Sequence, residues 1–410
     1  MNKPERIVIT GLGSVSAIGA GVAPLFAAAL SGRSGIRPWP DAHGRWVAGA
    51  VPDAVAGDTG MHSLPANVDR HVGLATLAVR EALDCAGLPR IAHEESETTG
   101  VYWGTGVGSA ATVENTYATI HNGQRPRPLT ILLAMQNAAV AQIALDHGLR
   151  GPQLSISQAC SSAAAAIGEA MLALRWGRAH RIVVGGSDAP LVPGQLQAWE
   201  SLRVLAKVDP AAPETSCRPF DASRSGLVLG EGAGALVLER ESVALARGAN
   251  IIAELCGYGN AGDASHYARP DPNGQQRAMA MAIADAGLAA SDIGYINAHA
   301  TATMVGDAAE AAAIHAFFGD APDAPAVSST KGVHGHALGA SGALELVITT
   351  KALVAGQLPP NAHLSHPDVT GIDLICGEPR RRKIEAALSN TFAFGGSNIS
   401  LAIRCYRPRD

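Results

Sequence analysis

Apolar residues along this chain gather in short segments that alternate with longer, alanine-rich stretches. The short segments have the length of strands, and the alanine-rich stretches have the length of helices. We expect strands over residues 6–10, 99–103, 154–157, 181–184, 234–238, 251–258, 293–298, 326–329 and 386–390. We expect helices over residues 72–85, 161–174, 275–286, 308–318 and 340–355. This alternation predicts an α/β protein with parallel or mixed sheets covered by helices.

The alternation of strands and helices occurs twice, and the second series begins near Asn250. We therefore predict two similar α/β halves, residues 1–250 and residues 251–410. No low-complexity linker or block of charge separates them, which favours halves packed as one unit over tethered modules. Function is then expected between the two halves.

Composition narrows the class of protein. The 410 residues are 47% hydrophobic and 16% charged, as in a compact globular enzyme. The net charge of −5 and the lack of a basic stripe argue against a nucleic-acid binder. The six cysteines show no C-x-x-C pair or metal-ligand spacing, so we expect no metal site, no disulfide framework and a reducing compartment. No segment reaches the ~18 uninterrupted apolar residues of a membrane span, and we expect a cytoplasmic protein without membrane contact.

Three glycine clusters, over residues 11–13, 104–108 and 230–234, raise the question of nucleotide binding. The first lacks the third glycine of a dinucleotide-binding turn, and the last leads into a strand where a helix is required. No Gly-Lys-Ser/Thr of a phosphate-binding loop occurs. We expect instead that these glycines form tight turns between strands and helices.

Cys160 stands where the alternating run 153–157 gives way to the helical stretch 161–174. A strand therefore delivers this cysteine to the N-terminus of a helix. Unpaired N–H groups and the helix dipole favour a thiolate there, and we expect a pKa below the ordinary value of roughly 8.5. The other interpretation is a small buried thiol without chemistry, which is what most such cysteines are.

Two histidine segments follow Cys160, each where a strand runs into a loop: residues 297–303 with His299, and residues 328–336 with His336. Loops on a rigid scaffold are typical positions for catalytic groups. A histidine about 140 residues after the cysteine also matches the spacing of papain-like proteases. Their local signature is absent, because Cys160 lies mid-chain in Gln-Ala-Cys-Ser-Ser-Ala.

Taken in order along the chain, a set of motifs resembles the β-ketoacyl-acyl carrier protein synthases, elongating condensing enzymes of the thiolase superfamily. The resemblance covers nearly the whole sequence. The motifs are Val8 to Gly13, Gly151-Pro152, Ala159-Cys160-Ser161, Arg218-Pro219-Phe220-Asp221, Gly226 to Gly232, Asn297-Ala298-His299, Ser329-Thr330-Lys331, Gly335 to Ala340 and Asn390 to Asn398.

The resemblance implies a thiolase-like fold in which the two α/β halves form a five-layered αβαβα sandwich. It implies that Cys160 takes an acyl chain from a carrier-protein thioester, and that malonyl-acyl carrier protein then decarboxylates. His299 and His336 would stabilise the enolate, which attacks the acyl group and gives a β-ketoacyl thioester two carbons longer. This reaction belongs to fatty-acid or specialised polyketide or polyene biosynthesis, and it needs no cofactor beyond the carrier's phosphopantetheine.

Further roles are implied residue by residue. The backbone N–H groups of Cys160 and Phe394 would form the oxyanion hole, with Phe394 and Phe392 as the gate. Lys331 and Glu310 match a supporting pair. Asp307 and Glu345 match acidic positions near this pair, and Thr301 and Thr303 match positions that help to hold the pantetheine arm. Val107 and Met135 are expected in the acyl pocket. The expected contacts with the carrier protein are Arg203, Lys207 and Arg70.

Some positions depart from the family's pattern: Ala300 and Ala393 replace glycines, Ser397 replaces threonine, and His334 is unusual. These departures weaken the case for a housekeeping fatty-acid enzyme. The family's other basic contacts near Ala66 and Asn67 are missing here, which favours a dedicated carrier protein of a specialised polyketide or polyene pathway.

The family also implies a homodimer, or a heterodimer with a related subunit, in which residues 132–135 cross into the partner's pocket. A non-catalytic chain-length partner subunit is the alternative, but such partners lack the nucleophile that Cys160 supplies. Starter-type synthases and thiolases use Cys-His-Asn or Cys-His-Cys sets, which the segment around His336 does not fit.

Overall fold

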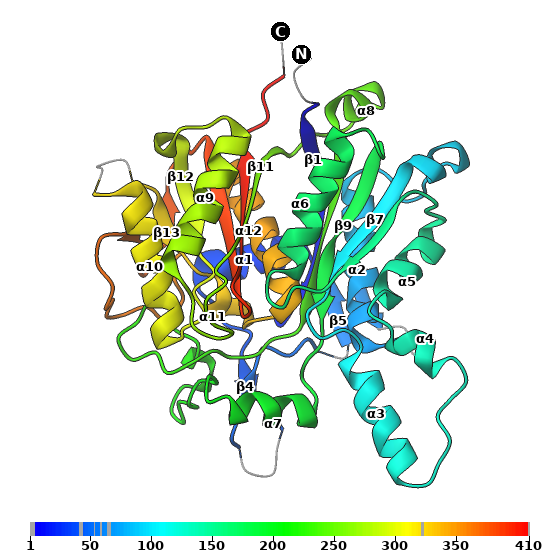
Figure 1. The fold of residues 1–410 in the computed structure, drawn as a ribbon, viewed down its shortest axis with the longest axis horizontal. Coiled ribbons are helices and arrows are strands. Elements are labelled where there is room, and N and C mark those ends of the chain that lie inside the picture. Colours follow the sequence, from blue (N-terminus) through cyan, green and yellow to red (C-terminus); the bar gives the residue numbers. More distant parts are fainter. Residues whose placement is uncertain are drawn as a thin grey trace.

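The computed structural model describes residues 5–40, 44–52, 54–57, 60–63, 67–320 and 324–408. Its centre is a 12-stranded mixed sheet in which the strands follow the order β15-β13-β12-β17-β18-β11-β1-β10-β9-β7-β8, with β2 paired to β1. Helices cover this sheet on both faces (Figure 1). The fold is therefore α/β with a mixed sheet, as the sequence predicts.

The N-terminal half supplies one end of the sheet. Its strands are β1 (Ile7–Ser16), β7 (Thr99–Gly104), β8 (Gln153–Ile156), β9 (Arg181–Asp188) and β10 (Gly232–Arg240). Strand β7 runs parallel to β8 and β9, whereas β10 is antiparallel to β9 and β1. On the outer face lie α2 (Arg70–Cys85) and α5 (Ala138–His147), and on the inner face lies α6 (Ser162–Arg175).

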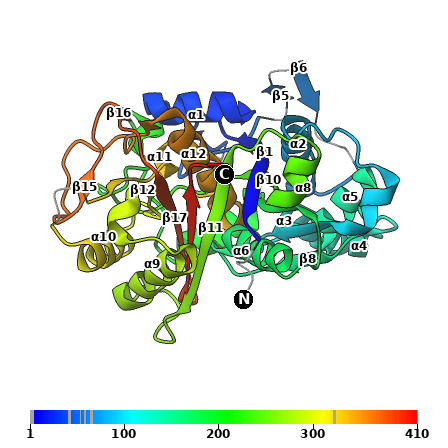
Figure 2. The ribbon, with the colours of Figure 1, turned by 90° about the horizontal axis from the view of Figure 1, so that it is seen from above.

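The C-terminal half supplies the other end. Its strands are β11 (Ala253–Gly262), β12 (Ile293–Asn297), β13 (Ala326–Ser328), β15 (Asp373–Leu374), β17 (Ala386–Ala393) and β18 (Ser397–Arg404). The outer helices are α9 (Pro272–Ala286) and α10 (Met304–Phe318), and the inner helix is α12 (Ser341–Ala355). Strand β11 pairs with β1 and joins the two halves side by side (Figure 2).

The remaining elements lie around this frame. They are β2 (Gly19–Ala20), α1 (Val22–Ser31), β3 (Arg37–Pro38), β4 (Val47–Ala48), β5 (Ala54–Gly57), β6 (Gly60–Ser63), α3 (Ala110–His121), α4 (Thr130–Ala134), α7 (Pro193–Ser201), α8 (Glu241–Ala246), α11 (Lys331–His334), β14 (Gln357–Leu358), β16 (Arg380–Arg381) and four short 3₁₀ turns.

Helices α6 and α12 form the middle layer between the two sheet halves. Helix α6 contacts β7 and β9, α12 contacts β10 and β17, and the two helices contact each other. The sequence of layers is thus outer helices, sheet, inner helices, sheet and outer helices, which confirms the five-layered sandwich. The stretch Leu338–Ala355 is long and apolar enough to cross a membrane, but 83% of it is buried inside the fold.

The glycines of β1 do not form the tight turn that the sequence analysis expects. Strand β1 continues through Gly11 and Gly13 to Ser16. A Cβ atom at Gly11 would lie 2.0 Å from the carbonyl oxygen of Ala82, and one at Gly13 would lie 2.0 Å from that of Ala78. These glycines are needed because α2 packs directly on the strand backbone.

The same packing recurs in the other half. A Cβ atom at Gly257 of β11 would lie 2.0 Å from the carbonyl oxygen of Ala282, and one at Gly259 would lie 2.0 Å from that of Ala278 on α9. Each half therefore pairs a glycine-containing strand with an alanine-containing helix in the same way. This equivalence is direct structural support for two similar halves.

We expect Gly257→Ala to destabilise the protein by about 1–3 kcal/mol, because the added methyl overlaps backbone that cannot move alone. Gly262→Ala is the matched control, since a Cβ atom at that position of the same strand meets nothing within 4 Å. Thermal or denaturant unfolding measures both. Equal midpoints for the two variants would contradict the close strand–helix packing.

Candidate active site

Cys160 lies on a strained turn between β8 and α6. Ala159, the residue before it, has a φ of 49°, which costs energy for a residue with a side chain. The turn is fixed by Ser162, whose Oγ accepts a hydrogen bond from the Gln158 N–H at 2.8 Å, and by Ser161, whose Oγ donates to the Gln158 carbonyl at 2.8 Å. The predicted strand-to-helix delivery of Cys160 is confirmed.

The expected low thiol pKa is not found. Burial raises the pKa of Cys160 to about 12, and only 5% of the residue is exposed. The charge of Lys331 and the backbone N–H groups of Phe394 and Cys160 act in the opposite direction. Loss of solvent therefore outweighs the helix N-terminus, and the resting nucleophile is a neutral thiol.

Both predicted histidines meet Cys160. His336 Nε2 lies 3.0 Å from Cys160 Sγ, and its Nδ1 lies 2.9 Å from Ser341 Oγ. The ring of His299 stands edge-on to that of His336, with centroids 5.2 Å apart. Burial and the Lys331 charge hold the pKa of each imidazole well below its usual range. The site thus combines a neutral thiol with two neutral imidazoles.

The same three side chains are the set best placed to ligate a metal ion among the described residues, with donor atoms within 4.8 Å of one another. Two ligands of a tetrahedral zinc ion, one thiolate and one imidazole, stand roughly 3.5 Å apart. The 3.0 Å between Sγ and Nε2 is shorter and suits a hydrogen bond. That a metal has no part in this site stays a prediction.

Parallel strands bring the two histidine loops together. Strand β12 pairs in parallel with both β13 and β17, so these strands end at one edge of the sheet. His299 follows β12 by two residues, and the loop after β13 leads through α11 to His336. The backbone of His336 is held further by a parallel bridge to Leu229.

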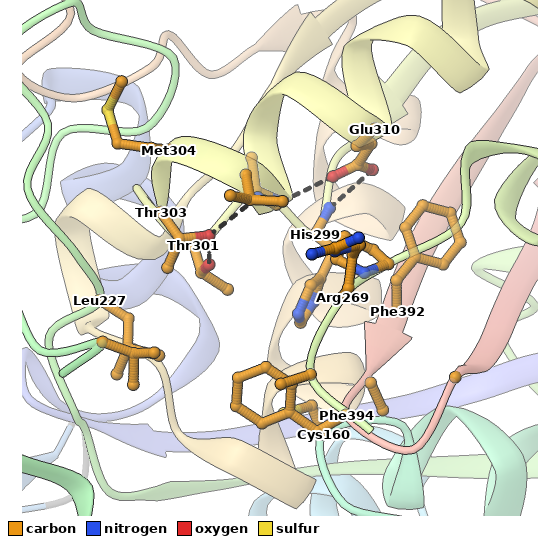
Figure 3. Close-up of a pocket in the computed structure, with 18 of the residues that line it drawn as sticks. Cys160, Leu227, Arg269, His299, Thr301, Thr303, Met304, Glu310, Phe392 and Phe394 are labelled. Atoms are coloured by element: carbon orange, nitrogen blue, oxygen red, sulfur yellow. Dashed lines mark hydrogen bonds between the residues drawn. The ribbon is translucent and has the colours of Figure 1, made fainter. Parts of the chain in front are cut away.

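Glu310 fixes the His299 loop. Its carboxylate accepts hydrogen bonds from the N–H groups of His299 at 3.0 Å and Ala300 at 2.7 Å (Figure 3). The Lys331 ammonium forms its ion pair with Glu345. The supporting role of Lys331 with Glu310 stays a prediction. Glu310 is thus satisfied mainly by backbone N–H groups.

Asp307 fixes the next part of the same loop. Its Oδ2 accepts from the Phe220 N–H at 2.8 Å and lies 3.7 Å from the Arg224 guanidinium. The hydroxyls of Thr301 and Thr303 are 3.1 Å apart and line the cavity (Figure 3). Thr303 also caps α10, which ties the proposed pantetheine contacts to that helix.

A cavity of about 420 Å³ leads to Cys160. Phe392, Phe394, Thr301 and Thr303 line it. The described lining includes neither Val107 nor Met135.

Val107 packs instead in the apolar cluster that contains Cys160, and Met135 is 45% exposed after α4. The acyl-pocket roles of these two residues stay predictions.

Other residues at the site gave no recognisable signal in the sequence. The ring of Trp199 on α7 stacks on Phe394 with centroids 6.0 Å apart. His266, Tyr267 and Arg269, from the segment between β11 and α9, line the cavity. Their positions depend on how this segment crosses the sheet edge, which no local motif encodes.

The three expected carrier-protein contacts differ in their surroundings. Arg203 is exposed and lines the cavity, with a φ of 60°. Lys207 is exposed four residues later. Arg70 contacts the buried Glu231 at 2.6 Å. The carrier-protein role of Arg70 stays a prediction.

The fold and the Cys-His-His group define a condensing enzyme of the thiolase class. The chain matches the family model "Beta-ketoacyl synthase, N-terminal domain" over residues 4–244, and "Beta-ketoacyl synthase, C-terminal domain" over residues 252–365. The chain belongs to the beta-ketoacyl synthase family.

Curated relatives span the whole chain. The nodulation protein E of Rhizobium meliloti (strain 1021) is 40% identical over 406 residues, covering 98% of this chain and 99% of the relative. The 3-oxoacyl-[acyl-carrier-protein] synthase 2 of the same organism is 37% identical over 418 residues, with the same coverage.

Solved structures agree. A beta-ketoacyl synthase from Burkholderia phymatum STM815 superimposes with a TM-score of 0.89 at 33% identity, covering 98% of this chain and 100% of that chain. A type II polyketide ketosynthase in complex with its acyl-carrier protein gives a TM-score of 0.90 at 27% identity, with the same coverage. The ishigamide ketosynthase/chain length factor gives 0.88 at 30%, covering 99% and 100%.

The raised thiol pKa predicts how alkylation of Cys160 depends on pH. The thiolate fraction grows about tenfold per pH unit below the pKa, so iodoacetamide labelling should accelerate steadily from about pH 6 to about pH 9. Mass spectrometry of the Cys160 peptide follows the rate separately from the exposed Cys85. A plateau below about pH 8 would show that the thiolate already exists at rest.

Proposed function

We propose that this chain catalyses the decarboxylating condensation of a Cys160-bound acyl chain with malonyl-acyl carrier protein. The observation that carries the proposal is the buried group of Cys160, His299 and His336 at the inner end of the cavity. Such a group can hold an electrophile covalently and stabilise an enolate beside it. The chemistry needs no resident cofactor, because phosphopantetheine arrives with the substrates.

In the first half-reaction the Cys160 sulfur attacks the acyl thioester. His336 Nε2, 3.0 Å from Sγ, accepts the thiol proton as the new S–C bond forms. The carrier's sulfur leaves with the bonding electron pair and takes up that proton. The low imidazole pKa of His336 means that the proton is held only briefly.

In the second half-reaction malonyl thioester loses CO2, and the electrons of the broken C–C bond move into the thioester as an enolate. N–H groups of His299 and His336 would stabilise the charge on the thioester oxygen. The α-carbon attacks the acyl carbonyl, and the backbone N–H groups of Cys160 and Phe394 would receive that oxyanion. Collapse releases the Cys160 sulfur and a β-ketoacyl thioester extended by two carbons.

The partner proposed for the cavity mouth is an acyl carrier protein, as in the ketosynthase complex among the structural neighbours. Exposed Arg203 and Lys207 are the proposed contacts. A dedicated carrier of a specialised pathway is favoured because the family's other basic contacts near Ala66 and Asn67 are missing from this sequence. Measuring turnover with a carrier protein of a specialised pathway and with one of primary metabolism tests this proposal. Equal catalytic efficiency with both carrier proteins would count against specialisation.

A second subunit is proposed on the side of α3 and α4, where Leu129, Ile131, Leu132 and Met135 are 45–70% exposed. The partner is a second copy or a related subunit, as in the ketosynthase/chain length factor neighbour. Cys160 and both histidines are present here, so this chain would be the catalytic member.

Mass spectrometry with a panel of acyl-carrier-protein donors tests the first half-reaction. We expect an acyl adduct on Cys160 and none on Cys160→Ala, followed by a β-keto product when malonyl-carrier protein is added. A folded protein that takes no acyl group from any donor would instead favour the non-catalytic partner subunit.

The two histidines are expected to differ in the half-reaction in which they act. We expect His299→Ala to retain acylation of Cys160, because His299 does not contact Sγ through a hydrogen bond in the described structure. Condensation should fall by about 10²–10³-fold, the usual loss of one oxyanion donor. Single-turnover assays with acylated enzyme measure this. Equal loss in both half-reactions would remove His299 from the enolate step.

A further inference from the structure

The cavity has a buried inner end and an exposed outer end. Cys160, His299 and His336 line its inner end and are 1–8% exposed. Tyr267 and Met304 also line it and are 87% and 52% exposed. These exposed residues mark the mouth, through which a ligand must pass to reach the sulfur.

Two arginines, Arg203 and Arg269, belong to this mouth, because both line the cavity and both are exposed. Arg269 lies in the segment between β11 and α9. Its backbone N–H donates to His266 Nδ1 at 3.1 Å, so the loop conformation does not depend on the guanidinium. Figure 3 shows the Arg269 side chain among the lining residues, on the side of His299 and Phe392.

The carboxylates that line the cavity are already occupied. Asp263 accepts from the Asn398 side chain at 2.6 Å and from the Asp271 N–H at 3.1 Å. Glu310 accepts from backbone N–H groups of its own loop. No carboxylate in the described part of the chain forms an ion pair with Arg269. Its five N–H donors therefore face the mouth without an acidic partner.

We propose that Arg269 binds the phosphodiester of the prosthetic arm as the arm enters the cavity. The inference rests on the proposed function, since it assumes that substrates arrive on phosphopantetheine. A planar guanidinium suits a phosphate because it can donate two parallel hydrogen bonds. Arg203 adds a second positive charge at the same mouth.

The malonyl carboxylate is the other anion that enters this site, and it fits Arg269 less well. Decarboxylation removes that negative charge, so an ion pair with arginine would stabilise the substrate more than the transition state. The phosphodiester keeps its charge throughout the reaction. The phosphodiester is therefore bound equally in the substrate complex and in the transition state. Loss of this binding should raise KM and leave kcat nearly unchanged.

Acylation of Cys160 in the absence of malonyl substrate tests the assignment. Hexanoyl-phosphopantetheine and hexanoyl-pantetheine, which lacks the phosphate, serve as donors for wild type and Arg269→Ala. We expect the variant to lose about tenfold in kcat/KM with the phosphorylated donor, through KM. With the unphosphorylated donor the two proteins should react alike.

Arg269→Lys and Arg90→Ala are the comparison variants. Lysine keeps the charge and should restore part of the phosphate effect. Arg90 is exposed five residues after the end of α2, outside the described cavity lining, and controls for the loss of one positive charge. Arg90→Ala should match wild type with both donors.

Three outcomes would overturn the assignment. Equal losses with both donors would make Arg269 a structural residue. If acylation were unchanged and only the rate of condensation with malonyl-pantetheine fell, Arg269 would bind the malonyl carboxylate instead. A wild-type protein that takes no acyl group from either donor, or from acyl-carrier protein, would overturn the proposed function and this inference with it.

Discussion

The active site depends on one buried cation. Lys331 and Glu345 contact each other at 0% exposure, where an unpaired charge would cost several kcal/mol. The ammonium lowers the pKa of His299 and His336, and it lowers that of the Cys160 thiol against the larger effect of burial. Burial is the larger cause of the low pKa of each imidazole, and the ammonium adds to it. Together they keep both imidazoles neutral, so that each has one N–H to donate and one nitrogen to accept a proton.

The position of this cation follows from the sheet. Lys331 begins α11 three residues after the end of β13, and Glu345 belongs to α12 in the middle layer. The ion pair therefore ties the loop that carries His336 to the helix between the two sheets. Backbone strain gathers in the same region, with positive φ at Ala159, Ala302 and Leu338. Strain of this kind persists only where the surrounding structure holds it.

Motifs in the sequence are enough to predict the layered fold and the three side chains, Cys160, His299 and His336, that the structure brings together. Alternation and helix length fix those elements locally, and the ordered motifs name the family. Ion pairs between segments far apart in the sequence could not be predicted, among them those of Lys331 with Glu345 and of Arg70 with Glu231. The thiol pKa was predicted in the wrong direction because the helix N-terminus is visible in the local sequence, whereas the burial that raises the pKa of Cys160 depends on the whole fold. The prediction of a turn at Gly11 and Gly13 was wrong, because glycine is needed there for the close packing of α2 on the strand.

The donors around Cys160 link the thiol to the gate. The N–H groups of Phe394 and Cys160 now donate to the sulfur and favour its thiolate form. Once the sulfur is acylated it is a neutral thioester and a weak acceptor, so the same two donors become free for the carbonyl oxygen. Phe394 also stacks on Trp199, and its backbone is followed by Gly395 and Gly396 with positive φ. A movement of this loop that opens the cavity would withdraw one donor from the thiol but would also admit water, and burial is the larger cause of the raised thiol pKa.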